Sequence, residues 1–534
     1  MKRLPLLHLI LLFSLFAPSL VQAQALPEDE PVAQHDAVQS DAVYDEAARD
    51  GRLQFAPCPE NAALECGTLT LPVDYQNPHG ESFGMAVVRA KATDPNKRIG
   101  VLLTNPGGPG SSGVDFVLAG TQAPAFIQIR ERFDIVSFDV RGSHRSRPVS
   151  CAVQSPGDPA AVNEAELVAF FDDFSRHFAQ SCLAQNGPFL LTMSTNTIAR
   201  DMDVLRRALG ERQISYVGLS FGTELGAVYA SLFPKQVRAM ILDAGVAPEF
   251  YDNLVEFAAE QTISFELTLH RLDRLCRQAP ACRLRDTGVA AALDAVKAQL
   301  NAAPVTSPAG VVLDGDKVAD IVASLLSIES AWPLIVAALT DGQGGNYTRL
   351  FQFIPFISTI PLANTAFFAI KCNDQGTRRS AADYLPMSEA VGKLTTRLHN
   401  QFQVASIMAT CAAWPAADVP IIRNVQRQVA NPILLLGSDF DPNTPLSWTR
   451  SLAFALGMER NIVRYQGGGH TVVTRGLPCT HAVVKAYLFD LALPATGFTC
   501  PALPIAFDPA AVQASLEANL QQAAFQSFLP LIQQ

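Results

Sequence analysis

Three residues that lie far apart in the chain have the types that acyl transfer requires: Ser220, Asp441 and His470. Ser220 stands between Gly218 and Gly222 in the stretch VGLSFGTELG, after the strand-like run ISYVG and before an apolar helical pattern. A nucleophile on a tight strand-to-helix turn needs small residues on both sides, because the turn brings neighbouring Cα atoms close together. The stretch therefore predicts a nucleophilic serine, with an ordinary Gly-rich turn as the alternative.

A serine nucleophile needs a base, and His470 and His481 are the two histidines that follow the candidate acids. His470 comes after the strand pattern NIVRYQ, in the run GGGH, whose glycines predict a flexible tip that carries the imidazole to Ser220. His481 lies within the helical pattern PCTHAVVKAY, where a histidine on a helix surface is the better interpretation. We expect His470 to be the base.

The acid is expected at the end of the preceding strand pattern, where PILLLGSDFDPNTP offers Asp439 and Asp441. Asp441 begins the turn DPNTP and lies further past the strand, so we expect it to accept a hydrogen bond from Nδ1 of His470 and to stabilise the imidazolium. For each aspartate, capping of the turn is the alternative. The resulting order of serine, acid and histidine along the chain is that of an α/β-hydrolase.

Donors for a developing oxyanion are predicted at two places. The backbone N–H of Phe221 opens the helix after Ser220, and the run NPGGPGSSG ends an earlier strand pattern with Gly107 and Gly108. The backbone of these two glycines can approach the serine closely because they carry no side chain. No GK[ST] run follows and no GxGxxG opens a helix, which excludes the usual phosphate-binding loops.

The elements that must position these residues alternate between strand and helix patterns from about residue 84. This alternation predicts a mostly parallel central sheet flanked by helices. It stops over residues 247–429, where the patterns are mostly helical, and then resumes. We therefore expect an α/β-hydrolase core built from residues 51–246 and 430–534, with a large helical cap inserted over the carboxyl ends of the strands.

The first residues, 1–25, combine a basic start with a short apolar stretch and small residues at its end, which is typical of a secretory signal peptide. Residues 26–50 are acidic and Ala-rich, and are expected to form a flexible start of the mature chain. A membrane anchor is the alternative, although Pro5, His8 and Pro18 interrupt the apolar stretch. We expect a secreted or periplasmic protein without membrane attachment after cleavage.

Ten cysteines agree with export, because an oxidising compartment makes disulfides the default. Pairing of neighbours closes the shortest loops, although one sequence leaves the connectivity open. A metal site is disfavoured, since no CxxC occurs and no histidine lies at ligand spacing from a cysteine couple, and no cofactor is expected. The neighbouring couples are Cys58 and Cys66, Cys151 and Cys182, Cys276 and Cys282, Cys372 and Cys411, and Cys479 and Cys500.

Composition limits the classes of partner. The 534 residues are 49% hydrophobic and 17% charged, which suits a globular protein with a large core. The formal net charge is -10 and no long Lys/Arg run occurs, so nucleic acid and anionic membrane surfaces are poor partners. We expect a peptide or a small ester or amide as substrate. A monomer is compatible with the sequence, which leaves the oligomeric state open.

Taken together, the motifs resemble the secreted α/β-hydrolase serine exopeptidases, specifically tripeptidyl aminopeptidase-like enzymes related to proline iminopeptidases. The resemblance covers nearly all of the mature chain and is carried by NPGGPGSSG, FDVRGSHRSRP, VGLSFGTELGAVYASLFP, ILDAGV, KCND, CAAWP, GSDFDPNTP and GGGH. It implies a helical cap over the core, catalytic Ser220, Asp441 and His470, and cleavage of short peptides from a free N-terminus. The part from about residue 430 resembles the C-terminal, TAP-like region of that group.

The chain departs from that group at two places: His144 stands where relatives often have glycine, and Glu224 where many have an aromatic residue. An aminopeptidase must bind an ammonium group, for which Glu224 and Asp374 are candidates. A buried acid behind the turn and a loop acid beside a disulfide are the respective alternatives. An esterase or amide hydrolase with the same triad is the nearest other function, ahead of a non-catalytic binding protein on this scaffold.

Overall fold

A computed structural model describes the chain from residue 53 to residue 508, together with residues 510 and 512. The predicted signal peptide and the predicted flexible segment, residues 1–25 and 26–50, lie outside the described residues. The gaps within the described span are residues 121–123, 152–162, 249–253, 309, 355–364, 377, 396, 399–409, 416–424 and 426–428.

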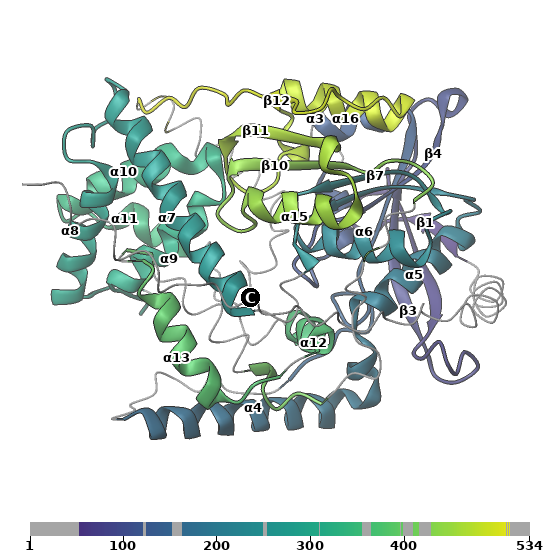
Figure 1. Ribbon diagram of the computed structural model, residues 1–534, viewed down its shortest axis with the longest axis horizontal. Helices are drawn as coiled ribbons and strands as arrows, with labels where there is room; N and C mark the ends of the chain where they lie inside the picture. Colours follow the sequence, from purple (N-terminus) through teal and green to yellow (C-terminus); the bar gives the residue numbers. More distant parts are fainter. Residues whose placement is uncertain are drawn as a thin grey trace, which may run out of the picture. The chain divides into compact units, whose positions relative to one another are not determined.

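A ten-stranded sheet runs through the structure (Figure 1). Its strands, in spatial order, are β1 (Gln54–Pro57), β2 (Glu65–Pro72), β3 (Ser82–Ala90), β5 (Phe133–Phe138), β4 (Gly100–Asn105), β6 (Ile214–Leu219), β7 (Val237–Asp243), β10 (Leu434–Phe440), β11 (Ile462–Gly468) and β12 (Thr499–Cys500). The pairs from β1 to β5 are antiparallel. All pairs from β5 to β12 are parallel, so the carboxyl ends of these strands meet at one edge.

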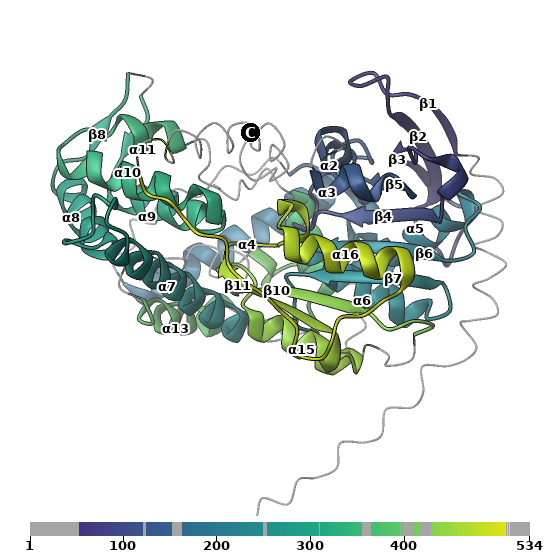
Figure 2. The same cartoon turned by 90° about the horizontal axis from the view of Figure 1, so that it is seen from above.

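Two apolar layers cover the faces of the sheet, because consecutive strand residues point to opposite faces. Within β6, Tyr216 joins one layer and Val217 joins the other. Figure 2 shows helices on both sides of the sheet, an arrangement that confirms the predicted α/β-hydrolase fold class. The first layer includes α5 (Thr195–Ala208), α6 (Phe221–Leu232) and α15 (Leu446–Leu456), and the second α2 (Gly113–Gly120), α3 (Pro124–Ile129) and α16 (Pro478–Asp490).

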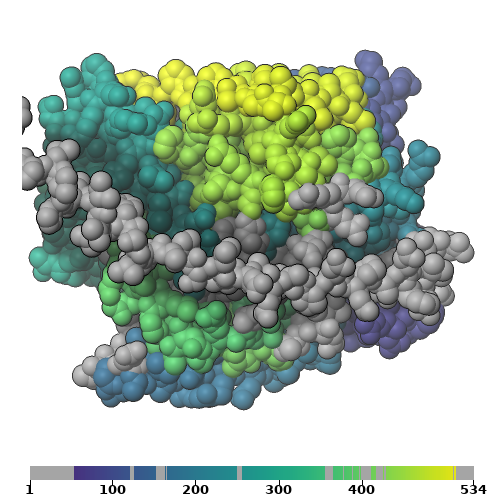
Figure 3. Space-filling model, viewed as in Figure 1, coloured from purple at the N-terminus to yellow at the C-terminus, as the bar shows by residue number. Residues whose placement is uncertain are grey.

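The helices inserted between β7 and β10 pack in two groups. The larger group, α7 (Leu254–Gln278), α8 (Val289–Ala302), α9 (Gly315–Leu326), α10 (Trp332–Gln343) and α11 (Thr348–Phe353), surrounds an apolar core of its own and includes a hairpin of β8 (Val305–Thr306) and β9 (Val312–Leu313). In Figure 3 its teal surface lies beside the yellow-green surface of the C-terminal part of the chain.

The second group lies outside the insertion's own core: α12 (Thr365–Asp374) packs in the apolar layer on the sheet, and α13 (Ala381–Gly392) packs in a small separate cluster with α7. α12 packs beside α4 (Glu164–Asn186), a helix that follows β5. Phe368 of α12 contacts Phe178 of α4 with ring centroids 5.5 Å apart. α13 packs on α4 as well as on α7. The outer bounds of the predicted cap, residues 247–429, stay a prediction.

Disulfides join the cysteines that are neighbours in sequence, which resolves the connectivity that the sequence left open. Among the residues that the structure describes, no helix combines the length and the apolar character that crossing a membrane requires. The five bonds are Cys58–Cys66, Cys151–Cys182, Cys276–Cys282, Cys372–Cys411 and Cys479–Cys500.

Candidate active site

Ser220 lies on a strained turn between β6 and α6. Its φ of 55° and ψ of -122° are unfavourable for a residue with a side chain, and its N–H donates to the carbonyl of Asp243 at 3.0 Å. A Cβ on Gly218 would lie 2.1 Å from the Gly222 oxygen, and one on Gly222 would lie 2.7 Å from the Asn105 oxygen. Only glycine fits at both flanks, which is the packing that the sequence motif predicts for a nucleophile turn.

The Gly-rich run after β4 lies directly against this turn. A Cβ on Gly107 would be 3.0 Å from Cβ of Ser220 and 3.2 Å from N of Phe221. The Gly107 N–H, however, donates to Oδ1 of Asn105 at 2.9 Å. The N–H groups of Gly108 and Phe221 donate to no residue that the structure describes. Gly108 and Phe221 are therefore better placed than Gly107 to hold an oxyanion.

The run FDVRGSHRSRP supports the Gly-rich run from the neighbouring strand. Oδ1 of Asp139 accepts the Ser112 hydroxyl at 2.6 Å and the Val114 N–H at 3.1 Å. Arg141 is fully buried and binds the Asp201 carboxylate through two nitrogens, at 2.6 Å and 2.7 Å. A buried charge is stable only when it is paired in this way. The run FDVRGSHRSRP therefore supports the Gly-rich run through the hydrogen bonds of Asp139 to Ser112 and Val114.

Asp441 and His470 contact each other just after the ends of β10 and β11. Nδ1 of His470 lies 2.9 Å from Oδ2 and 3.0 Å from Oδ1 of Asp441. Asp441 is buried, and its Oδ1 also accepts the N–H groups of Asn443 and Thr444 at 2.9 Å and 3.0 Å. The Thr444 hydroxyl donates to Oδ2 of Asp441 at 3.0 Å and lies 3.3 Å from Nδ1 of His470. Thr444 thus contacts both residues, and no sequence motif points to it, although it lies in the same DPNTP turn.

The alternative acid and base lie elsewhere. Asp439 forms an ion pair with Arg464, with Nη2 and Oδ2 2.6 Å apart. His481 lies on helix α16, and its Nε2 is 3.1 Å from Oε1 of Gln128 on α3. The structure thus brings Asp441 to His470, and Asp439 and His481 have other partners.

Asp243, the last residue of β7, connects the serine turn with the histidine loop. Its carbonyl accepts the Ser220 N–H, and its Oδ2 accepts the N–H groups of Val472 and Val473 at 2.7 Å and 2.8 Å. One buried aspartate therefore holds both the chain that carries Ser220 and the chain that follows His470. No sequence motif points to Asp243, because its contacts span 229 and 230 residues.

The electrostatic environment favours a charged imidazole. Burial lowers the pKa of His470, but the charge and the hydrogen bond of Asp441, assisted by the charge of Asp243, outweigh it and raise that pKa above its ordinary value. Burial also raises the pKa of Asp243 to about 6, against the opposing effect of the Val473 and Val472 N–H groups. His470 is therefore a stronger base than a histidine in water, which suits proton abstraction near neutral pH.

The two candidate amine-binding acids lie behind the serine turn. Glu224 is fully buried, and its Oε2 accepts from Nζ of Lys371 at 3.1 Å. Lys371 also lies over the Phe221 ring, 5.4 Å from the ring centroid. Asp374 is buried and accepts the N–H and hydroxyl of Thr195 at 2.9 Å and 2.7 Å; burial and the nearby Glu224 raise its pKa to about 7. With both acids buried and bound to other groups, their role in amine binding stays a prediction.

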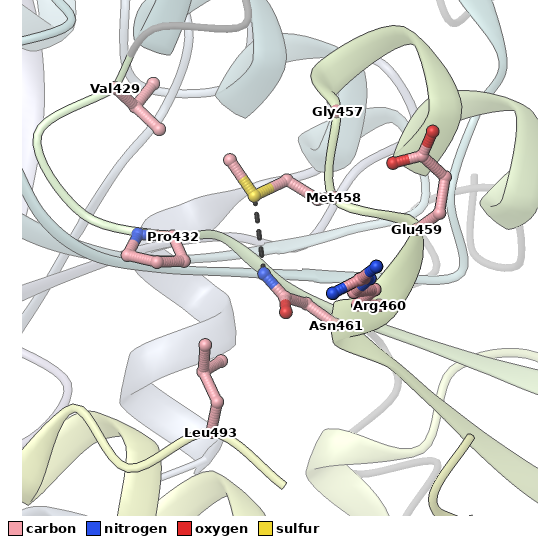
Figure 4. A pocket seen from close by; sticks show the side chains of 8 residues that line it. All are labelled: Val429, Pro432, Gly457, Met458, Glu459, Arg460, Asn461 and Leu493. Carbon is pink, nitrogen blue, oxygen red and sulfur yellow. Dashed lines mark hydrogen bonds between the residues drawn. The ribbon is translucent and has the colours of Figure 1, made fainter. Parts of the chain in front are cut away.

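A cavity of about 380 Å³ lies at the opposite edge of the sheet (Figure 4). Pro432 precedes β10 and Asn461 precedes β11, whereas Asp441 and His470 follow these strands. The cavity is therefore not part of the candidate active site. Within the described part of the chain, no group of three or more His, Cys, Asp and Glu side chains could hold a metal ion. The cavity is lined by Val429, Pro432, Gly457, Met458, Glu459, Arg460, Asn461 and Leu493.

Comparison with known proteins finds two family models that match. The α/β-hydrolase fold matches residues 100–307, and the TAP-like protein model matches residues 397–500. The tripeptidyl aminopeptidase of Streptomyces coelicolor is 30% identical over 458 residues, which cover 82% of this chain and 83% of that protein. Serine protease Hip1 of Mycobacterium tuberculosis is 29% identical over 82% of this chain and 87% of its own. Carboxylesterase B of the same species is 29% identical over 84% of this chain and 88% of its own.

Proposed function

This chain belongs to the TAP-like family of α/β-hydrolases and is a serine hydrolase, and on that premise we propose that Ser220, Asp441 and His470 are its catalytic triad. The observation that carries the proposal is the 2.9 Å contact between Nδ1 of His470 and Oδ2 of Asp441, at the sheet edge where the strained Ser220 turn also lies. The strain supports a functional role, because strained backbone clusters at active sites.

The reaction is acyl transfer. Nε2 of His470 takes the hydroxyl proton of Ser220 while Oγ attacks the substrate carbonyl carbon. The N–H groups of Phe221 and Gly108 stabilise the oxyanion, and His470 then gives its proton to the leaving group. Water, activated by His470, releases the acyl group from Ser220 and restores the enzyme. Asp441 keeps the imidazole in the required tautomer and stabilises its charged form throughout.

The proposed substrate is a peptide with a free N-terminus. The enzyme would release a short N-terminal piece from it, such as a tripeptide. The support comes from the relative named tripeptidyl aminopeptidase, which matches 82% of this chain. A second candidate is hydrolysis of small esters, since a relative of similar identity carries the name Carboxylesterase B. We also propose that the protein acts outside the cytoplasm, supported by its five disulfides and the basic and apolar first residues.

Replacement of the nucleophile tests the triad. We expect Ser220→Ala to lower kcat by about a millionfold, as loss of a triad nucleophile does, and to abolish labelling by an organophosphonate. Ser231→Ala, on the same helix and buried, is the matched control and should label at the wild-type rate. Undiminished labelling of Ser220→Ala would rule out this serine.

A substrate comparison separates the two candidate functions. We expect wild-type enzyme to cleave a peptide with a free N-terminus and to reject the same peptide after N-acetylation, with release of product measured by chromatography. Equal cleavage of both peptides, or cleavage of short acyl esters alone, would favour the esterase.

A further inference from the structure

A short segment of the insertion reaches the loops of the acid and the base. Residues 327–331 connect α9 with α10 and contain the short helix η4 (Glu329–Ala331). Together with Trp332, the first residue of α10, they form what we call the clamp segment, residues 327–332. Glu329 and Trp332 are buried, with 7% and 0% of their surfaces exposed. The clamp segment follows Ser220 by more than a hundred residues and precedes Asp441 by a similar distance. Its contacts with both loops are therefore a result of tertiary folding.

Ser327 contacts both catalytic loops. Its carbonyl accepts the backbone N–H of His470 at 2.7 Å. Its hydroxyl accepts a hydrogen bond from Nδ2 of Asn443 at 2.8 Å, and the Asn443 N–H in turn donates to Oδ1 of Asp441 at 2.9 Å. The clamp segment thus holds the backbone of the base directly and the loop of the acid through one side chain.

Glu329 holds the chain on both sides of His470. Its Oε1 accepts the Gly468 N–H at 2.7 Å, and its Oε2 accepts the Tyr465 hydroxyl at 2.8 Å. Oε2 also lies 3.2 Å from Nη1 of Arg475, whose Nη2 donates to the Gly468 carbonyl at 2.9 Å. Both carboxylate oxygens are satisfied, which a buried charge requires. The contacts bind residues 465, 468 and 475, so the loop that carries His470 is held at its start and at its end.

The glycines before His470 fit closely under the clamp segment. A Cβ on Gly468 would lie 2.4 Å from Cη2 of Trp332, and a Cβ on Gly469 would lie 2.9 Å from N of Glu329. The predicted flexible tip is therefore wrong: Gly468 and Gly469 are buried, and glycine is needed there because the clamp segment lies so close.

We propose that Glu329 is a positioning residue for His470, so that the insertion is part of the catalytic apparatus as well as a cover over the site. The inference rests on the proposed triad. Simple packing between insertion and core would scatter contacts along β10 and β11. The polar contacts of Ser327 and Glu329 instead fall on Gly468 at the end of β11, on the two loops and, within the strand, on the Tyr465 hydroxyl. A displacement of about 1 Å in a catalytic group can cost about a hundredfold in rate.

The test compares Glu329→Gln with Asp341→Asn. Asp341 lies in the same insertion and pairs with Arg349 at 3.1 Å, an ion pair between α10 and α11. We expect Glu329→Gln to lower kcat and the rate of organophosphonate labelling by about ten- to a hundredfold, with little change in KM. Asp341→Asn should keep the wild-type rate.

The pH profile gives a readout that a purely structural role would not move. The charged groups that act on His470 are Asp441, Asp243 and Arg475. A displaced loop weakens the contact with Asp441 and lowers the pKa of His470, so the acidic limb of the labelling rate should move to lower pH in Glu329→Gln. Tyr465→Phe removes one donor to Glu329 and should show a smaller change in the same direction; it decides the test if Glu329→Gln does not fold.

The outcomes separate this inference from the proposed function. Wild-type labelling at a residue other than Ser220 would overturn the triad and, with it, this inference. Wild-type labelling at Ser220, combined with a Glu329→Gln rate equal to that of Asp341→Asn, would overturn the positioning role alone. A loss in rate that only follows the folded fraction, with an unmoved acidic limb in both Glu329→Gln and Tyr465→Phe, would overturn it as well.

Discussion

The two halves of the candidate active site are built in different ways. On the nucleophile side, Ser220 and the Gly-rich run follow β6 and β4, which are neighbours in the sheet with Asn105 paired to Gly218. Their geometry comes from backbone packed against backbone, with glycines where a Cβ would clash. On the acid–base side, Asp441 and His470 follow β10 and β11, and their loops donate hydrogen bonds to residues 327–332 of the insertion.

The two halves are therefore expected to respond to different kinds of substitution. On the nucleophile side, where backbone packs against backbone, a polar substitution elsewhere should have little effect, but a methyl group added to one of the glycines would clash. A buried polar network tolerates small changes of volume but not the loss of a partner, because the remaining group is left unsatisfied. The insertion also contacts the nucleophile side, through the Lys371–Glu224 pair, but behind the turn rather than on it.

The largest effect in this comparison is expected on the acid–base side. Asp441→Asn should lower kcat by about ten-thousandfold, because the amide stabilises the wrong imidazole tautomer. Asp439→Asn is the matched control: its aspartate lies two residues away and pairs with Arg464. Steady-state kinetics of the two variants check this expectation. A comparable loss in Asp439→Asn would show that the wrong acid has been assigned.

The next largest effect is expected from a steric clash on the nucleophile side. Gly107→Ala would place a Cβ 2.5 Å from the Leu219 carbonyl oxygen, at a φ of 100°, and should lower kcat on the order of a hundredfold by displacing the oxyanion donors. Gly210→Ala has a φ of 74° and no atom within 4 Å of its Cβ, so it should cost only about 1 kcal/mol of stability. If both variants lose activity equally, backbone strain rather than the close approach is responsible.

The smallest effect concerns the acids behind the turn. The pKa of Asp374 is about 7 in the folded protein, against an ordinary value of 3.8, so the folded state binds its proton more tightly. Its contribution to stability is fully present below about pH 3.8 and is lost as the pH rises towards 7. Asp374→Asn should therefore lose fewer degrees of unfolding temperature than wild type between pH 4 and pH 8, as calorimetry measures.

The same variant sharpens the role of Asp374 in substrate binding. A KM that rises for free peptides and stays unchanged for esters would support binding of the substrate amine. An unchanged KM for both substrates would leave Asp374 with its structural contact to Thr195, where its carboxylate accepts the N–H and the hydroxyl.

Much of the nucleophile side could be predicted from the sequence, because its determinants are close in the chain. Gly218, Ser220 and Gly222 lie within five residues, and the two glycines beside Ser220 indicate a tight turn. The prediction was less complete for the oxyanion donors, because Gly107 and Gly108 are the same residue type and the sequence does not distinguish their roles. A hydrogen bond from the Gly107 N–H to Asn105 distinguishes them, and no sequence pattern signals it.

Less of the acid–base side was accessible. The sequence predicted that the acid precedes the base, and it favoured Asp441 over Asp439 and His470 over His481. Thr444, Asp243 and Glu329 were missed, because each acts through contacts that residue type does not signal. The run GGGH predicted a mobile tip for the same reason: glycine marks both free loops and close packing, and only the neighbours tell the two apart.

From the sequence alone came the fold class, the expectation of disulfides, and a predicted chain order of serine, acid and histidine, since periodicity, cysteine count and chain order can be read without coordinates. The sequence left the pairing of the cysteines open, and the structure pairs neighbours. The tertiary structure alone decided how the base is held. Residues 327–332 belong to the insertion and contact His470 and its loop, and that contact depends on how α7 to α11 pack around their own core. Contacts of that range arise from the packing of whole elements, which no single stretch of sequence specifies.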